Sequence, residues 1–209
     1  MGSGKEMLEK ERVNKLRQNL FSDQFDRVVS ISTRADVPAL EVEIFRYLVN
    51  ERGMSGIIIC VNRSPNYYAN LFFTRGINLK KVGFVNVGFK KCKIKGVKIT
   101  EAGEPDDLLS IIMTTIKSVK SMKRKNVEKE VFVILDSITT LLMYNNMKRI
   151  GRFLHDLNVR LRDLKVGFIL IVEPSSRLRD LVSRFCDENI ILEHETAEKF
   201  ARAFLAEVH

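Results

Sequence analysis

Short segments made up entirely of apolar residues constrain the fold of this chain more than any other feature. Two of them, residues 131–135 (VFVIL) and 167–172 (GFILIV), contain no polar side chain. A strand that lacks polar–apolar alternation is buried on both faces, as in a parallel sheet covered by helices on each side. Apolar residues also dominate segments 28–32, 57–61, 82–87 and 189–192, which we expect to be strands as well.

Residues between these segments repeat apolar positions at intervals of three and four, which predicts amphipathic helices. The pattern is clearest at Leu108, Ile112, Ile116 and Val119. Further helices are expected around 44–49, 65–75, 150–164 and 178–185, whereas residues 88–106 and the polar residues 123–126 are expected to be irregular. Strands that alternate with helices through right-handed crossovers predict an α/β fold, with a doubly wound, mainly parallel sheet and helices on both faces.

The length of 209 residues suits one such domain. We expect it to span residues 25–209. Residues 1–24 are expected to form a charged N-terminal extension, with a short amphipathic helix at Val13, Leu16 and Leu20. Residues 198–209 fit either a strand or a helix. No apolar run reaches the roughly 18 residues that a membrane-spanning helix needs, so we expect no membrane span.

The three cysteines, Cys60, Cys92 and Cys186, are too widely spaced for a disulfide framework or for paired zinc ligands. The three histidines show no metal-binding spacing either. We therefore expect reduced thiols in a cytoplasmic protein that carries no metal and no cofactor. The net charge of +9 favours anionic partners such as nucleic acid, although lysine- and glutamate-rich surfaces also occur in proteins of hot environments.

An aspartate directly follows the first of the two fully apolar segments, within residues 131–142 (VFVILDSITTLL). Strand ends of open α/β sheets face the ligand crevice, and a carboxylate there is the Walker B arrangement, which holds a magnesium ion beside nucleotide phosphates. The same pattern starts ordinary helices, where Asp136 and Ser137 would cap free backbone N–H groups. The segment alone does not decide between these two roles.

The order of the elements resembles the KaiC-like branch of the RecA superfamily of ATPases, over about residues 25–195. The segments that carry the resemblance are 53–61 (second strand), 72–79 with 82–85 (helix, turn and third strand), 136–142 (Walker B run), 152–157 (following helix), and 167–173 and 185–192 (last core strands). The resemblance implies a RecA-like fold, an archaeal cytoplasm as the setting, and oligomers that assemble through the sides of the domain.

The phosphate loop of such ATPases, G-x-x-x-x-G-K-[ST], has no counterpart here. Its glycines let backbone N–H groups surround the phosphates and its lysine neutralises their charge, but residues 33–40 (TRADVPAL) contain neither residue type. The resemblance sets Val37 or its neighbour at the glycine, Pro38 near the lysine and Ala39 near the hydroxyl residue. Proline has no N–H to donate, and Asp36 would repel a phosphate.

The helix that follows this degenerate loop is expected to be satisfied internally, because Glu41 and Glu43 would lie in its first turn and suit its dipole. A second departure concerns the end of the second strand, where the family carries an acidic residue that polarises the attacking water. The corresponding residues 60–64 (CVNRS) include no carboxylate.

These two losses predict a pseudo-ATPase rather than an enzyme, with Asp136 and Ser137 as a Walker B-like remnant. We expect Asp136 to accept backbone hydrogen bonds at the helix start. The predicted role is regulatory or scaffolding, through binding to a protein partner or through self-association. Two alternatives stay open: a nucleic-acid-binding protein, and a nucleotide-binding ATPase with an atypical phosphate site.

The nucleic-acid alternative depends on a lysine-rich stretch within the irregular region. Its members are Lys90, Lys91, Lys93, Lys95 and Lys98. Such a cluster forms either a basic binding patch or a solvated loop with no ligand.

Overall fold

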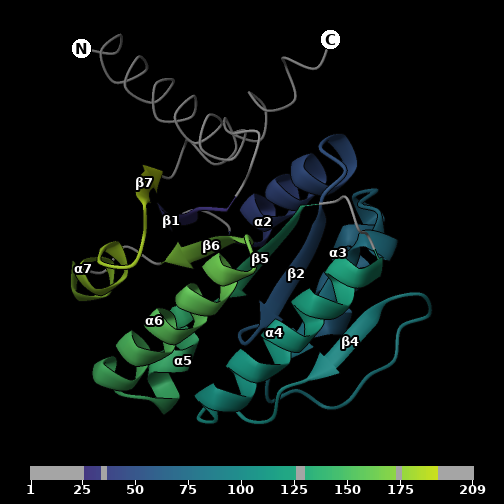
Figure 1. The fold of residues 1–209 in the computed structure, drawn as a ribbon. Coiled ribbons are helices and arrows are strands. Elements are labelled where there is room, and N and C mark those ends of the chain that lie inside the picture. Colours follow the sequence, from purple (N-terminus) through teal and green to yellow (C-terminus); the bar gives the residue numbers. More distant parts are fainter. Residues whose placement is uncertain (1–25, 34–36, 126–129, 173–175, 193–209) are drawn as a thin grey trace, which may run out of the picture.

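The computed structural model describes residues 26–33, 37–125, 130–172 and 176–192. In this part of the chain, seven strands form one sheet in the order β4-β3-β2-β5-β6-β1-β7, and each neighbouring pair runs parallel (Figure 1). The strands are β1 (Val28–Thr33), β2 (Ser55–Cys60), β3 (Val82–Asn86), β4 (Lys98–Glu101), β5 (Val131–Asp136), β6 (Gly167–Val172) and β7 (Glu188–Leu192). The predicted α/β class and parallel sheet are confirmed.

Helices connect the strands. They are α2 (Val37–Phe45), which continues into a π-helical segment (Arg46–Glu51), α3 (Pro65–Thr74), α4 (Leu108–Lys125), α5 (Ile138–Tyr144), α6 (Met147–Asp163) and α7 (Ser176–Ser183), with a 3₁₀ turn at Leu79–Lys81. Figure 1 shows α4, α5 and α6 on the side of the sheet that faces the viewer. The predicted extension 1–24 and the undecided segment 198–209 lie outside the described residues, so the domain boundary stays a prediction.

Two hydrophobic cores, one on each face, confirm the doubly wound arrangement. Along β2, Ile58 belongs to the core beneath α2 and α3, whereas Ile57 and Ile59 belong to the core beneath α4, α5, α6 and α7. Aromatic rings fill the first core, where the Phe45 ring centroid lies 4.6 Å from that of Phe72 and 5.0 Å from that of Phe132. Because both faces are covered, the central strands can be apolar throughout, as their sequences are.

The region predicted to be irregular contains a strand, β4, which pairs with β3 at one edge of the sheet. The prediction was wrong because β4 has only four residues, all partly exposed, and so lacks the apolar signature of the central strands. The predicted polar link at 123–126 was also wrong for its first residues, since α4 runs through Lys125. Lysine and arginine are good helix formers, and their charge suits a helix C-terminus.

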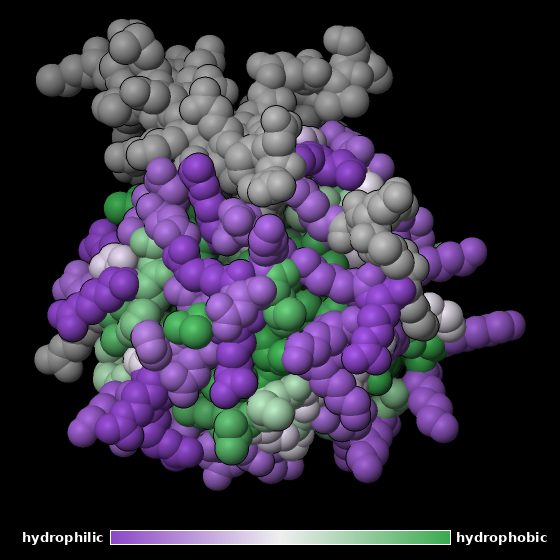
Figure 2. Space-filling model, in the orientation of Figure 1, coloured by the Kyte–Doolittle hydropathy of each residue, from purple (hydrophilic) through white to green (hydrophobic). Residues whose placement is uncertain are grey.

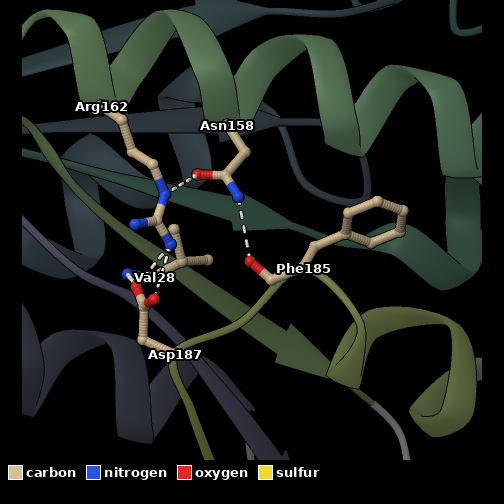
Figure 3. A network of polar contacts seen from close by, with 5 residues as sticks. All are labelled: Val28, Asn158, Arg162, Phe185 and Asp187. Atoms are coloured by element: carbon tan, nitrogen blue, oxygen red, sulfur yellow. Dashed lines mark hydrogen bonds and ion pairs between the residues drawn. The ribbon is translucent and has the colours of Figure 1, made fainter.

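A polar network holds the opposite edge strand, β7, in place (Figure 3). The guanidinium of Arg162, near the end of α6, donates to both carboxylate oxygens of Asp187 at 2.7 Å. The same carboxylate accepts the backbone N–H of Val28 at 2.8 Å. Asn158 accepts from Arg162 Nε at 3.0 Å and donates to the carbonyl of Phe185 at 2.9 Å. The network thereby joins the amino ends of β1 and β7 to α6.

Gly56 provides a test of the packing between the sheet and α2. A Cβ atom at this position would lie 2.5 Å from ring atoms of both Phe45 and Phe132, which are already packed against each other. We expect Gly56→Ala to lower the free energy of unfolding by about 1–3 kcal/mol, because overpacking forces these rings from their positions. Urea denaturation measures the change.

The matched control is Gly151→Ala, on α6. Its Cβ would meet only Leu181 Cδ1, at 3.4 Å, which a flexible side chain can accommodate. Because alanine favours a helix over glycine by up to about 1 kcal/mol, we expect this substitution to be neutral or stabilising. Equal decreases in stability at the two positions would contradict the packing described for β2.

Candidate functional site

Asp136, the aspartate singled out in the sequence, is the last residue of β5 and is completely buried. Ser137 follows it through a cis peptide bond and caps α5, accepting the backbone N–H of Thr140 at 3.3 Å. The partners of the Asp136 carboxylate are instead side chains, those of Tyr68 and Arg63. Asp136 does accept backbone hydrogen bonds, but through its own carbonyl and from Val61 and Asn62 at the end of β2. The cap at the helix start, which we expected from Asp136, comes from Ser137.

Tyr68, on α3, links two carboxylates in the interior. Its Oη lies 2.6 Å from Glu41 Oε2 and is also hydrogen bonded to Asp136 Oδ2. All three side chains are fully buried. A phenol has one proton and can donate to only one of the two carboxylates. The contact between Tyr68 Oη and the remaining carboxyl group is therefore a hydrogen bond only if that carboxyl group is protonated and donates to Tyr68 Oη. We call Glu41, Tyr68 and Asp136 the buried carboxyl cluster.

Glu41 was not recognised as part of a site by the sequence analysis. It was expected with Glu43 in the first turn of a helix, but α2 begins at Val37 and has no acidic residue in that turn. Glu41 instead points into the core, while Glu43 lies 2.9 Å from Arg46 in an ion pair. A signal was present in the sequence, because Glu41 lies three and four positions before Ile44 and Phe45 and so shares their buried face.

The electrostatics of the cluster favour the protonated form of the Asp136 carboxyl group. Burial raises the pKa of Asp136, and the hydrogen bond from Tyr68 and the charge of Arg63 offset only part of that rise. Burial, together with both carboxylates, also raises the pKa of the Tyr68 phenol, which therefore keeps its proton. The Nη1 of Arg63 lies 3.7 Å from Asp136 Oδ1, and its Cζ lies 5.7 Å from the centroid of the Tyr67 ring.

Cys60 occupies the end of β2, where the sequence lacks the expected carboxylate. It is fully buried, and burial raises the pKa of its thiol well above the usual value, an effect that Asp136 and Glu41 increase. The thiol is therefore protonated and unreactive at neutral pH. It supplies neither a general base nor an ionised metal ligand, and no cluster of three metal-binding side chains occurs among the described residues.

Three of the four degenerate-loop residues lie in the described structure, and Asp36 lies outside it. Val37, Pro38 and Ala39 form the first turn of α2, with Pro38 buried and Ala39 exposed. This helix start and the carboxyl end of β5 contribute to one region, because Glu41 of α2 and Asp136 of β5 share Tyr68. These three residues thus belong to the helix that supplies the second carboxylate.

Four of the five lysines of the predicted patch are exposed. Lys90, Lys91, Lys93 and Lys95 lie in the connection between β3 and β4, whereas Lys98 is the first residue of β4 and is partly buried. Asn86 anchors this connection by donating to the carbonyl of Phe89 at 3.0 Å and to Glu101 Oε2 at 2.7 Å. The lysines do not contribute to the buried carboxyl cluster.

Comparison with solved structures gave many matches, and one of them names the fold. A KaiC-like protein of the hyperthermophilic archaeon Pyrococcus horikoshii OT3 superposes with a TM-score of 0.60, at 15% sequence identity, over 80% of this chain and 73% of that chain. The chain has a RecA-like fold of the KaiC type. The resemblance seen in the sequence is thereby confirmed for the fold, and an identity of 15% carries it no further.

Comparisons with family models and with curated proteins gave no match. Within the KaiC-like fold, the buried carboxyl cluster lies at the carboxyl ends of the strands, where open α/β sheets bind their ligands. A hollow of about 420 Å³ lies at the other end of the sheet, lined by Asp26, Arg27, Arg162, Asp187 and Glu188. No helix in the described ranges is both long and apolar enough to cross a membrane.

The raised pKa of Asp136 predicts a particular pH dependence of stability. The folded protein binds this proton more tightly than the unfolded chain, in which the pKa is about 4. The stabilisation is complete below that value and is lost as the pH rises through the folded-state pKa. We expect Asp136→Asn to remove this pH dependence, because the amide does not titrate. Urea denaturation between pH 4 and neutrality, at steps of about one unit, measures it.

Asp187→Asn is the matched control, with the opposite sign. Burial alone would raise the pKa of Asp187, but the hydrogen bonds from Arg162 and Val28 lower it overall. Its contribution to stability is present above the unfolded-state pKa and is lost as the pH falls. We therefore expect Asp187→Asn to lower the free energy of unfolding by a nearly constant amount between pH 4 and neutrality, without changing the slope there. An unchanged slope in the Asp136→Asn variant would show that Asp136 is ionised throughout, against our description of the cluster.

Proposed function

We propose that this chain is a non-catalytic, KaiC-like domain that acts as a regulatory or scaffolding protein through protein–protein contacts. One observation carries the proposal: the side chains beside Asp136 already bond it and one another. Tyr68 contacts both carboxylates of the buried carboxyl cluster, and none of the three side chains is exposed. A buried carboxyl group that is already hydrogen bonded to Tyr68 is not available to a hydrated magnesium ion.

The residues that lead into α2 argue further against a triphosphate. Residues 33–45 contain neither glycines, which let backbone N–H groups surround the phosphates, nor a lysine to neutralise them. Arg34 is the one basic residue of this segment, and the acidic residues Asp36, Glu41 and Glu43 outnumber it.

The end of β2 supports the same conclusion for hydrolysis. Cys60 fills this position with a buried, protonated thiol, and residues 61–64 add no carboxylate. Without a carboxylate at this position, the usual base for an attacking water is missing. The proposed setting is an archaeal cytoplasm, which the archaeal source of the similar structure supports.

Titration calorimetry with ATP and magnesium tests the proposal. We expect no heat of binding and no rise in melting temperature, since a ligand at 100 times its dissociation constant would stabilise the fold by about 2.7 kcal/mol. ATP turnover should remain at background and should be the same in the wild type and in the Asp136→Asn variant. Saturable binding with turnover that falls in this variant would instead establish an ATPase with an atypical phosphate site.

Nucleic-acid binding is a second candidate function, favoured by the exposure of Lys90, Lys91, Lys93 and Lys95 in one short connection. Exposed lysines that track a phosphate backbone release counterions, which makes the affinity depend strongly on salt. The connection is polar and lies beside the edge strand β4, so it is accessible to a large ligand.

A lysine-to-glutamine variant at these four positions tests the second candidate. If the connection binds nucleic acid, fluorescence anisotropy should show wild-type affinity falling steeply with salt. The variant should lower the slope of log K against log salt by roughly 0.7–0.9 for each phosphate that it no longer neutralises. The control variant replaces Lys117, Lys120 and Arg124, which are also exposed but lie on α4. Absence of binding at low salt would dismiss this candidate.

A further inference from the structure

Large apolar side chains gather on the surface where α4 and α6 begin and α5 ends. They are Leu109, Met113, Met143, Tyr144 and Met147, with exposed fractions between 37% and 79%. We call this set the α4–α6 corner. Figure 2 shows apolar groups at the surface between hydrophilic ones over the lower part of the face that carries these helices.

Hydrogen bonds hold the three helix ends together. Asn145, between α5 and α6, donates to the carbonyl of Pro105 at 2.9 Å and to that of Leu141 at 3.0 Å. Arg149, in the first turn of α6, donates to the carbonyl of Asp106 at 2.8 Å. Both residues reach the turn that leads into α4, so the corner is a fixed surface with defined geometry.

Packing among the residues that the structure describes does not account for this exposure. The buried sides of α4 and α6 are already apolar, through Ile112 and Ile116 on one helix and Leu154 and Leu157 on the other. Clustered apolar groups on a surface mark binding sites, and methionine, tyrosine and arginine are enriched at the centres of protein interfaces. Methionine in particular adapts its shape to a partner.

The charges around the corner are balanced, unlike those of the chain. Three exposed acidic residues precede α4, namely Glu104, Asp106 and Asp107, and three exposed basic residues belong to the start of α6, namely Lys148, Arg149 and Arg152. The formal net charge of the whole chain is +9. This net charge makes two copies repel each other, but at this corner the acidic group of one copy matches the basic group of the other.

The basic group lies where a helix by itself does not favour it. Lys148 and Arg149 belong to the first turn of α6, where the helix dipole disfavours positive charge, so a facing acidic group would stabilise them. The exposed side of α4 carries Leu109 and Met113 and then, one turn further, Lys117. This change from apolar to basic side chains marks the border of the corner. An apolar centre flanked by opposite charges is complementary to itself about a two-fold axis.

We propose that the α4–α6 corner is the site where a second copy of this chain docks, in a two-fold dimer. The apolar side chains form the centre of the interface, and the acidic turn before α4 of each copy faces the basic start of α6 of the other. This inference deepens the proposed function and rests on it, because it names one partner and one surface for the scaffolding role.

Sedimentation velocity over a range of protein concentrations tests the dimer. Met143→Asp should raise its dissociation constant by roughly tenfold or more, because it places a charge at the apolar centre. Phe73→Asp is the matched control, since Phe73 is similarly exposed, at 75% compared with 79% for Met143, but lies on α3 against the other face of the sheet. It should leave the dissociation constant unchanged.

A charge exchange tests the two-fold geometry. Glu104→Lys and Lys148→Glu should each weaken the dimer, and the variant that carries both changes should recover affinity. A wild type that stays monomeric at its highest soluble concentration, a dimer that Phe73→Asp disrupts and Met143→Asp does not, or a double variant weaker than either single one would overturn the inference. ATP binding is measured separately, so a dimer that also binds ATP would overturn the proposed function alone.

Discussion

The hydroxyl of Tyr68 has one proton and two carboxylate neighbours, and this mismatch is the constraint on which the site depends. Glu41 Oε2 lies 2.6 Å away, and Asp136 Oδ2 is also within hydrogen-bonding distance. Both contacts of the hydroxyl are hydrogen bonds only if one of the carboxyl groups keeps a proton and donates it, and burial favours that protonated form at Asp136. The same hydrogen bonds tie α2, α3 and β5 together at the carboxyl edge of the sheet, where open α/β sheets bind their ligands.

Much of the fold was predictable, because it depends on features that are local in sequence. The apolar runs of β5 and β6 and the helical spacing in α4 each indicate an element without reference to distant residues. The edge strand β4 was missed because a half-exposed strand of four residues has no such pattern. Its existence depends on pairing with β3, which the local sequence does not encode.

The site was predictable only in part, for a related reason. Asp136 stands out because it ends an apolar strand, and the missing glycines and lysine are visible in residues 33–40. The roles of Glu41 and Tyr68 depend on hydrogen bonds between distant parts of the chain. Glu41 and Tyr68 are separated by 27 positions, and Tyr68 and Asp136 by 68. An acidic residue on the buried face of a helix was the one available signal, and it indicates a buried partner without identifying it.

The state of the site depends on a proton held between Glu41 and Asp136. Infrared difference spectroscopy of the wild type against each variant, at neutral pH, detects this proton directly through the carbonyl stretch of a protonated carboxylic acid. We expect such a band in the wild type, persisting as the pH of the solvent is varied across neutrality, and its disappearance or shift in both Glu41→Gln and Asp136→Asn. Two ionised carboxylates in the wild type at neutral pH would show that no such proton is held.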